Sequence, residues 1–413
     1  MRILVFWDNQ EEADLIEMYL NPADDEESTA ADAENEAQVV VSAGDFETAL
    51  NAHTAWDVVF LNLSWNDPEQ GVAYFEQTKS RLRDAPIVGA CFTQDVFRLA
   101  QYITQGLRSY LIRDSGKDFI FLIQTTLESA VESVRSERER IISEKLREEI
   151  DSVRKLQESI LPKKIKCPEP YSVVARYESS QIRVYGGQPV TLAGGDYYDV
   201  FALDDHRIVF LLGDASGHGM RACMSIMTMH TLVNMIRNAE YSNTAAFVAE
   251  INRQLCDERI VNQEGFITLL YGILDVETHQ FQWTSAGHPI PMLISLESGE
   301  IQSLGGLDDG GLPLGIYGDA EYDSHSSHIP PGSRLLLYTD GLEEAFPDGN
   351  RDAGQFGIEG IEKTLESSRV HQLPDALQAL FDDSLSFTRG AGRHDDSSAV
   401  LLERAVEVLA KQS

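Results

Sequence analysis

Two different patterns of apolar residues divide the chain into segments. In residues 1–118 short apolar runs alternate with segments of helical spacing, whereas short alternating runs dominate residues 162–413. The first pattern is typical of a parallel sheet that helices cover on both faces. The second is typical of an α+β domain rich in antiparallel strands. Between them, residues 119–161 contain neither proline nor glycine and predict one long helix that Pro162 ends.

The N-terminal pattern predicts five strands separated by helical segments. The expected strands are Ile3–Trp7, Val39–Ser42, Val58–Leu63, Pro86–Cys91 and Ser109–Ile112. Short apolar runs between helices are typical of a doubly wound, flavodoxin-like α/β domain. Residues 21–37 interrupt this pattern with seven acidic side chains, and we expect them to form a solvated insertion.

The long helix carries two apolar seams. The first follows a spacing of three and four residues, and the second is shifted by one residue; together they comprise Ile120, Ile123, Leu127, Ala130, Val134 and Ile141, then Ile142, Leu146, Ile150, Val153 and Ile160. Such a seam usually pairs with another helix, and the shift would locally disturb a supercoil. We expect a parallel homodimer through this coiled coil. The alternative is that the helix packs against its own domains.

The C-terminal pattern predicts a large antiparallel sheet content with three helices. The expected strands are Val173–Tyr177, Ile208–Gly213, Thr268–Asp275, Gln280–Ser285, Met292–Ser295, Arg334–Thr339 and Ala399–Leu402. The expected helices are Met220–Arg237, Thr244–Arg259 and Pro374–Leu385. The whole chain is therefore expected to be multidomain, with boundaries near 118 and 161.

Composition narrows the possible partners. The chain has 67 acidic and 33 basic residues, a formal net charge of −34, which would repel nucleic acid and anionic membranes. No stretch approaches the roughly 18 apolar residues that a membrane span requires. The four cysteines lie far apart without a CxxC pair, so neither a disulfide framework nor a zinc site is indicated. A reducing cytoplasm fits this usage.

Four short acidic motifs stand out in the last segment. Each places an aspartate at a strand end beside glycine or another acid, where backbone and carboxylate can close around an ion. Carboxylate, carbonyl and water ligands without histidine or cysteine select hard cations such as Mg²⁺ or Mn²⁺. The motifs are Gly194-Gly195-Asp196-Tyr197-Tyr198-Asp199, Gly213-Asp214-Ala215-Ser216-Gly217-His218-Gly219, Tyr338-Thr339-Asp340-Gly341-Leu342-Glu343-Glu344 and Asp395-Asp396-Ser397-Ser398.

In this order, the motifs resemble the metal-dependent (PPM, type-2C) protein phosphatases, in particular the SpoIIE/RsbU-like serine phosphatases. The resemblance extends to the lead-in Leu156–Pro162. It implies a β-sandwich of two sheets flanked by helices, with two Mn²⁺ or Mg²⁺ ions at one end. It also implies that Asp214 bridges the ions near the Ala215 carbonyl. The remaining ligands that it implies are Asp196, Asp340 and Asp395, with Asp396 less favoured.

The chemistry that the resemblance implies is hydrolysis without a covalent intermediate. Two ions would lower the pKa of a bridging water, and the resulting hydroxide would attack phosphorus in line. His218 could protonate the leaving group, although a loop histidine more often only packs and hydrogen-bonds. Arg221 and Arg393 are candidates for gripping phosphate, against the alternative of solvated charges. The sequence assigns no role to His288 in its Gly-His-Pro turn, and it assigns core positions to Tyr197, Tyr198, Met220, Met224, Met227 and Met229.

The first segment resembles response-regulator receiver domains but lacks their phosphorylation chemistry. An active receiver has an acceptor aspartate after its third strand, where this chain has Asn62. Trp7 replaces one acid beside Asp8, Cys91 or Thr93 occupies the Ser/Thr position, and Arg113 replaces lysine. We therefore predict a pseudo-receiver, a receiver-like domain that works without phosphorylation, as a dimerisation or docking module. The alternative is a fold kept only as a structural cap.

These observations give two hypotheses for the function. The first is a cytoplasmic serine/threonine protein phosphatase; the resemblance implies a STAS-type anti-sigma-factor antagonist as its phosphoprotein substrate in a partner-switching pathway. The second is an adaptor without turnover that binds a signalling partner. Retention of all four aspartates favours the enzyme, because an adaptor does not need every metal ligand. A nucleic-acid-binding regulator is disfavoured by the charge.

Overall fold

The computed structural model describes residues 1–21, 35–52, 55–162, 165–182, 190–191, 194–217, 219–236, 243–257 and 265–406. The chain divides into two compact units, Met1–Leu146 and Arg147–Ser413, and each is described by itself. The boundary falls inside one long helix, α5 (Ile120–Ile160), so both units contain part of the expected linker helix. Most of the acidic insertion expected at 21–37 lies outside the described residues.

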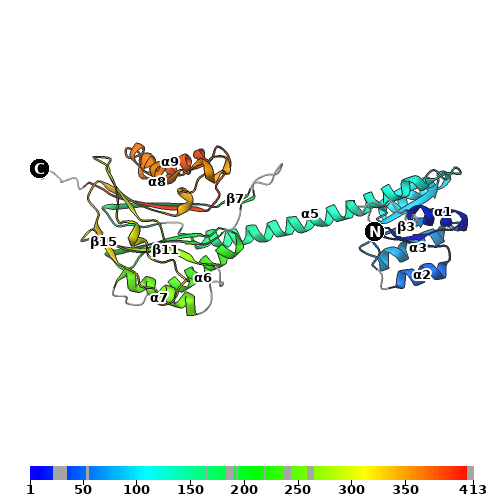
Figure 1. Ribbon diagram of the computed structural model, residues 1–413, viewed down its shortest axis with the longest axis horizontal. Coiled ribbons are helices and arrows are strands. Elements are labelled where there is room, and N and C mark those ends of the chain that lie inside the picture. The colour runs from blue at the N-terminus through cyan, green and yellow to red at the C-terminus, as the bar shows by residue number, and fades with distance from the viewer. Residues whose placement is uncertain are drawn as a thin grey trace. The chain divides into compact units, whose positions relative to one another are not determined.

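The N-terminal unit is a parallel sheet with helices on both faces (Figure 1). Its strand order, β2-β1-β3-β4-β5, is that of the flavodoxin-like doubly wound fold, and each adjacent pair is parallel. The α/β expectation is confirmed. The elements are β1 (Arg2–Phe6), α1 (Gln10–Leu20), β2 (Glu36–Val40), α2 (Ala43–Asn51), β3 (Val58–Asn62), α3 (Pro68–Arg81), β4 (Ile87–Phe92), η1 (Thr93–Arg98), α4 (Leu99–Thr104) and β5 (Ser109–Arg113).

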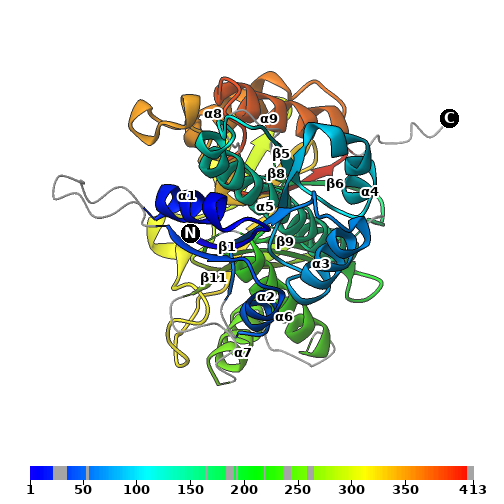
Figure 2. The same ribbon diagram turned by 90° about the vertical axis from the view of Figure 1, so that its right-hand side faces the viewer.

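Alternation along β1 divides the core of this unit into two layers. Ile3 and Val5 pack with α1 and the first turns of α5, whereas Leu4 and Phe6 pack with α2, α3 and α4 on the other face. Figure 2 shows α1 on one side of the sheet, with α2 and α3 on the other. Because both faces are covered, the strands read as continuous apolar runs in the sequence.

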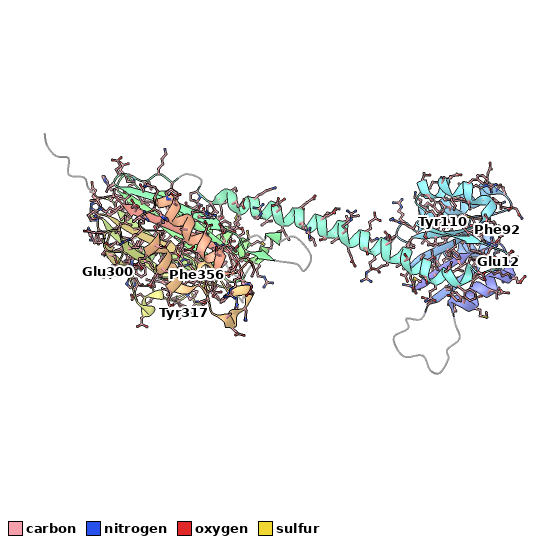
Figure 3. All side chains as sticks on the ribbon, turned by 90° about the horizontal axis from the view of Figure 1, so that it is seen from above. Glu12, Phe92, Tyr110, Glu300, Tyr317 and Phe356 are labelled. Atoms are coloured by element: carbon pink, nitrogen blue, oxygen red, sulfur yellow. The ribbon has the colours of Figure 1, made fainter. Side chains whose placement is uncertain are left out.

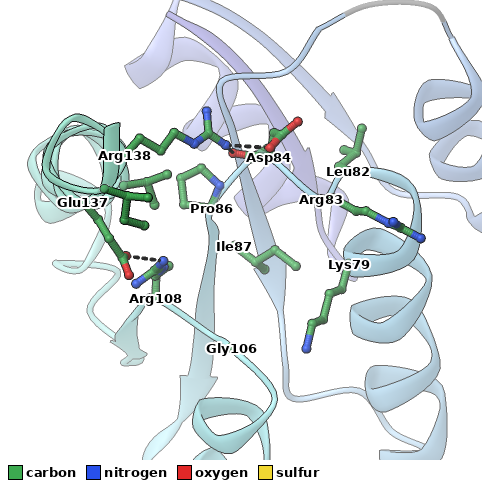
Figure 4. A pocket seen from close by; sticks show the side chains of 13 residues that line it. Lys79, Leu82, Arg83, Asp84, Pro86, Ile87, Gly106, Arg108, Glu137 and Arg138 are labelled. Carbon is green, nitrogen blue, oxygen red and sulfur yellow. Dashed lines mark hydrogen bonds and ion pairs between the residues drawn. The ribbon is translucent and has the colours of Figure 1, made fainter. Parts of the chain in front are cut away.

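The first apolar residues of the α5 seam are buried within the N-terminal unit. Ile123 and Leu127 are fully buried against the sheet. Two exposed ion pairs, Arg108–Glu137 at 2.7 Å and Arg138–Asp84 at 2.8 Å, hold the next turns beside a pocket of about 350 Å³ (Figure 4). Exposed pairs contribute less than about 1 kcal/mol each, so apolar burial dominates this attachment. Farther on, the exposed apolar residues of the seam are Ile141, Ile142 and Leu146.

The C-terminal unit is a sandwich of two antiparallel sheets, with orders β15-β12-β11-β10-β9 and β14-β13-β16-β17-β6. Its strands are β6 (Tyr171–Glu178), β7 (Gln181–Ile182), β8 (Val190–Thr191), β9 (Asp196–Ala202), β10 (Arg207–Ala215), β11 (Ile267–Asp275), β12 (Gln280–Ala286), β13 (Met292–Ser295), β14 (Ile301–Ser303), β15 (His325–His328), β16 (Ser333–Tyr338) and β17 (Ser397–Arg404). Its helices are α6 (Met220–Ile236), α7 (Thr244–Asp257), α8 (Gly357–Ser367) and α9 (Leu373–Phe387), with short turns η2 (Leu307–Gly310), η3 (Asp340–Leu342), η4 (Pro347–Gly349) and η5 (Arg351–Ala353).

Three apolar clusters separate the four layers of this unit. One lies between the two sheets and includes Phe210, Trp283 and Leu337. The other two attach α6 and α7 to the first sheet, and α8 and α9 to the second (Figure 1). The seven expected strands and three expected helices are present, with small differences at their described ends. The expected last residues of two helices, Arg237 and Arg259, lie outside the described residues. None of the helices in the described ranges is both long and apolar enough to cross a membrane.

Candidate active site

Two of the predicted metal ligands face each other across one antiparallel strand pair. Asp196 begins β9 and Asp214 lies near the end of β10, and the register places them directly opposite. Directly opposed residues point to the same face with Cβ atoms about 5 Å apart. Both side chains are buried, and like charges in this position destabilise a sheet. The pairing therefore places a strong demand for positive charge at this point.

A small cradle opens beside this pair because Gly195 has no side chain. A Cβ at Gly195 would lie 2.8 Å from the carbonyl oxygen of Ala215 and 3.1 Å from Oδ1 of Asp214. These oxygens therefore converge on one small space, and a larger residue at 195 would fill it. The backbone N–H of Ala215 donates to the carbonyl of Gly195 at 3.0 Å, which fixes the two turns together.

The Asp340 motif reaches the same place from the second sheet. Thr339 follows β16, and its Oγ1 donates to Oδ2 of Asp196 at 2.7 Å. Oγ1 of Thr339 also accepts the backbone N–H of Ser398 at 2.8 Å. This one buried hydroxyl therefore links three of the four motifs. Asp340 follows at once in η3. The other oxygen of Asp196, Oδ1, is buried without a hydrogen-bond partner among the described residues.

The two neighbouring aspartates before β17 are held differently. Asp396 accepts backbone N–H groups at both oxygens, from Ser180 at 2.7 Å and from Gly195 at 2.5 Å. Asp395 accepts the N–H of Asp396 at one oxygen only, at 2.8 Å. Through these contacts, Asp396 holds the backbone of the Gly195 turn in place. The assignment of Asp395 as the ligand of this pair stays a prediction.

Burial and mutual repulsion raise the pKa values of these carboxyl groups. The pKa of Asp214 is raised by burial and then by the charges of the other acids, Asp196, Asp340, Asp395 and Asp396. Burial raises the pKa of Asp395 to about 7, and burial with Glu344 and Glu343 nearby raises that of Asp340 to about 6. The five carboxyl groups therefore lie within each other's electrostatic reach. A perturbed acidic cluster of this kind is typical of a functional site.

The donor set suits hard divalent cations if water and backbone oxygen complete it. In the described part of the chain, no three acidic, histidine or cysteine side chains stand close enough to enclose one ion by themselves. Mg²⁺ commonly binds through one or two carboxylates and keeps several waters. The orphaned Asp196 oxygen and the cradle of Asp214 and Ala215 fit that kind of site.

One residue at the end of α5 contacts the site without having been predicted to do so. Gln157 is fully buried, and its Nε2 donates to the carbonyls of Gly194 and Asp196 at 3.0 Å each. Its Oε1 accepts the N–H of Gly194 at 2.8 Å. Because β9 is an edge strand, this amide replaces a missing strand neighbour. The lead-in string at 156–162 was the only signal in the sequence that could have marked it.

The arginines and histidines near the motifs differ in their environments. Arg393 is buried and binds Glu178 and the carbonyl of Phe381, both at 2.8 Å, so it is structural and does not grip phosphate. Arg221 is exposed in the first turn of α6. His288 is buried in its turn with Nδ1 2.9 Å from Thr268 Oγ1. His218 lies outside the described residues.

The core assignment for the aromatic and methionine residues is only partly right. Tyr197, Tyr198 and Met229 are buried as expected. Met220 and Met224 are exposed, because they fall on the outer side of α6. The short motif does not reveal which face of this helix each apolar residue occupies.

The acidic residues after β1 in the N-terminal unit pair with a buried cation from the chain itself. Arg113 is buried at the end of β5 and binds Asp8 at 3.0 Å, Glu12 at 2.7 Å and Oδ1 of Asn62 at 2.7 Å. Its guanidinium also lies over the rings of Trp7 and Phe92. Glu12 and Phe92 lie at the same end of this unit (Figure 3). Of the two candidates for the Ser/Thr position, Cys91 lies inside β4 and Thr93 is the first residue after it.

Comparison with known proteins matches the C-terminal unit to a family. Residues 204–405 match the family described as Stage II sporulation protein E (SpoIIE). The phosphoserine phosphatase RsbU of Bacillus subtilis is 24% identical over 315 residues, which cover 76% of this chain and 87% of RsbU. The phosphoserine phosphatase RsbP of the same organism is 29% identical over 150 residues, 36% of each chain.

A solved structure shares the fold. The SiaA-PP2C domain of Pseudomonas aeruginosa superposes with a TM-score of 0.51 at 18% sequence identity. The match covers 64% of this chain and 98% of that domain. The expected PPM sandwich flanked by helices is thereby confirmed for the C-terminal unit.

Proposed function

Because this chain carries a phosphatase domain of the SpoIIE family, we propose that it hydrolyses phosphoserine or phosphothreonine on a partner protein with the help of divalent metal ions. The observation that carries the proposal is the burial of Asp196 directly opposite Asp214. A fold maintains such a pair against repulsion when a cation completes it. An adaptor would gain nothing from this cost.

Asp196, Asp214, Asp340 and Asp395, with the Ala215 carbonyl, are the groups that would hold two Mn²⁺ or Mg²⁺ ions. Bound ions of this kind supply acidified water and neutralise charge on a transferring phosphoryl group. The resemblance supports this ligand set, and the convergence of Ala215 and Asp214 on one cradle supports two of its members.

The other residues of the chain would prepare this site by position. Thr339 holds one oxygen of Asp196 and leaves Oδ1 free to face an ion. Asp396 fastens the Gly195 turn, and Gln157 fastens the strand start that carries Asp196. Catalytic groups work best when their supporting contacts fix them before substrate arrives.

We infer that the substrate is a phosphorylated STAS-type anti-sigma-factor antagonist in a cytoplasmic partner-switching pathway. The similarity to RsbU over most of both chains supports this assignment. We also infer that a homodimer forms through α5, since Ile141, Ile142 and Leu146 of its seam are exposed. The N-terminal unit would act as a pseudo-receiver whose Arg113 replaces the charge of a bound metal.

The test is an assay of phosphate release from a phosphoserine peptide. The protein is measured with Mn²⁺, with Mn²⁺ and excess chelator, and as Asp340→Asn with Mn²⁺. Turnover is expected only in the first sample. Equal turnover in all three samples would contradict the proposed metal-dependent mechanism.

A further inference from the structure

Helix α6 differs from the rest of the chain in charge. The chain has 67 acidic residues, yet the 17 residues of α6 include no acid, and Arg221 is their only charged residue. A phosphoserine adds a charge of about −1.5 to −2, so most of this acidic surface would repel a phosphoprotein. The face of α6 contributes no such repulsion and offers one cation.

The outer side of α6 combines exposed methionines with two threonines, Thr228 and Thr231, whose hydroxyls donate to backbone carbonyls of the helix. Met220, Met224 and Met235 are 40%, 64% and 72% exposed. They recur at helical spacing on one side, while Ile226 and Val233 face the core. Methionine adapts its shape to varied partners and is frequent on surfaces that bind protein segments. This stripe is therefore suited to docking apolar residues of another chain.

The first turn of α6 lies beside the proposed catalytic site. Ala222, in the first turn of α6, has its Cβ 3.2 Å from the position that a Gly195 Cβ would occupy. The same position lies 3.1 Å from Oδ1 of Asp214. Ala222 lies on the buried face of the helix, whereas Arg221, the residue before it, is exposed in the same turn. A chain that docks along α6 would enter the site at its N-terminal end.

We propose that the exposed face of α6 is the docking surface for the phosphoprotein substrate. The methionine stripe receives apolar residues that flank the phosphoserine, and Arg221 attracts the phosphate toward the aspartates. The proposal rests on the proposed phosphatase function and adds a recognition rule: the enzyme selects phosphoserines with apolar neighbours.

The experiment compares two phosphoserine peptides of equal length and net charge, one with leucine and isoleucine flanks and one with serine and glycine flanks. The full-length protein with Mn²⁺ is expected to have a kcat/KM about tenfold higher for the apolar-flanked peptide, as burial of one or two large side chains would give. In Met224→Asp and Met235→Asp this ratio should fall toward one. Arg221→Ala should lower kcat/KM for both peptides, and Arg221→Lys should restore part of the loss.

Val370→Asp is the matched control, because Val370 is 78% exposed and follows α8, on the other sheet of the same unit. This variant should keep the wild-type flank preference. Turnover of the polar-flanked peptide reports whether the enzyme works at all, so its presence without any flank preference would overturn only the docking proposal. A Met224→Asp protein that keeps the preference but loses its dimer in light scattering would assign the face to a second copy and also overturn the proposal.

Discussion

The two units each gather carboxylates at strand ends, but they balance the charge in opposite ways. In the N-terminal unit, Asp8 and Glu12 pair with Arg113, whose side chain is 2% exposed. In the C-terminal unit, Asp196 and Asp214 are buried, and no described lysine or arginine lies within ion-pairing distance of either. Folding alone completes the first pocket. We propose that ions from solution complete the second.

The difference shows that a fold can bury carboxylates either with a cation of its own or without one. In the proposed pseudo-receiver, a buried cation from the chain itself would remove the need for a metal, and Asn62 in place of an acceptor aspartate would remove phosphorylation chemistry. In the proposed metal site, the carboxylates of a buried pair without such a cation would repel each other until an ion binds. Removing a charge should therefore have opposite effects on the stability of the two units.

The largest effect is expected on catalysis. Asp214→Asn should lower kcat for a phosphoserine peptide roughly a thousandfold, because metal ions contribute several kcal/mol to such transition states. The metal-free variant should also unfold at a higher temperature than the metal-free wild type, since it removes repulsion with Asp196. Asp205→Asn, an exposed acid in the turn before β10, is the control. Loss of stability in metal-free Asp214→Asn would break the comparison.

The opposite sign is expected in the N-terminal unit. Arg113→Met should lower the free energy of opening of this unit by about 3–5 kcal/mol, because Asp8 and Glu12 lose their buried partner. Hydrogen exchange of the β1 and β3 amides in the full chain measures this change. Arg135→Met removes an exposed pair with Glu139 and should change the value by less than about 0.5 kcal/mol. Equal effects of both variants would show that the Arg113 network carries no special weight.

The pH dependence should also separate the sites. Folding raises the pKa of Asp395 from 3.8 to about 7 and that of Asp340 from 3.8 to about 6, so the metal-free fold binds more protons than the unfolded chain. The contribution of these two groups to the stability of the metal-free fold is therefore largest below pH 4. This contribution, on the order of a few kcal/mol, is lost as pH rises through 6 to 7. Thermal unfolding of the C-terminal unit with chelator should show this fall. Saturating Mn²⁺ should oppose it, because ligands bind in the deprotonated form; a metal-free fold that gains stability from pH 5 to 8 would contradict the account.

A smaller loss is expected at the helix end. Gln157→Leu removes three hydrogen bonds to the backbone of Gly194 and Asp196 and should lower kcat about tenfold to a hundredfold through misplacement of Asp196. Addition of more Mn²⁺ should restore part of the activity if the defect is in ligand position. Ser159→Ala, an exposed change two residues on, should leave kcat near the wild-type value. Full activity of Gln157→Leu would remove Gln157 from the positioning residues.

The smallest effect is expected from phosphorylation. Incubation of the protein with acetyl phosphate and Mg²⁺ should leave the mass unchanged, because the amide of Asn62 is a poor nucleophile and Arg113 occupies its oxygen. Intact-mass spectrometry is the measurement, with an active receiver protein as the positive control. Addition of one phosphoryl group to the N-terminal unit would refute the pseudo-receiver.

Local patterns were enough to predict most strands and the four aspartate motifs, since apolar periodicity and short strings are properties of neighbouring residues. Strands β9, β14 and β15 went unpredicted. The facing register of Asp196 and Asp214 depends on pairing between strands, and the contact from Gln157 depends on how α5 packs. Neither of these two features can be predicted from neighbouring residues alone. Helix α8 went unpredicted because glycines, the poorest helix formers after proline, begin and interrupt it at Gly357 and Gly360.

The most direct test is anomalous diffraction from crystals of the protein grown with Mn²⁺, recorded at the manganese absorption edge. The account predicts manganese peaks within coordination distance of the Asp214 carboxylate and the Ala215 carbonyl, with further ligands among Asp196, Asp340 and Asp395. A map without manganese there, in crystals whose aspartates point away from one another, would contradict it.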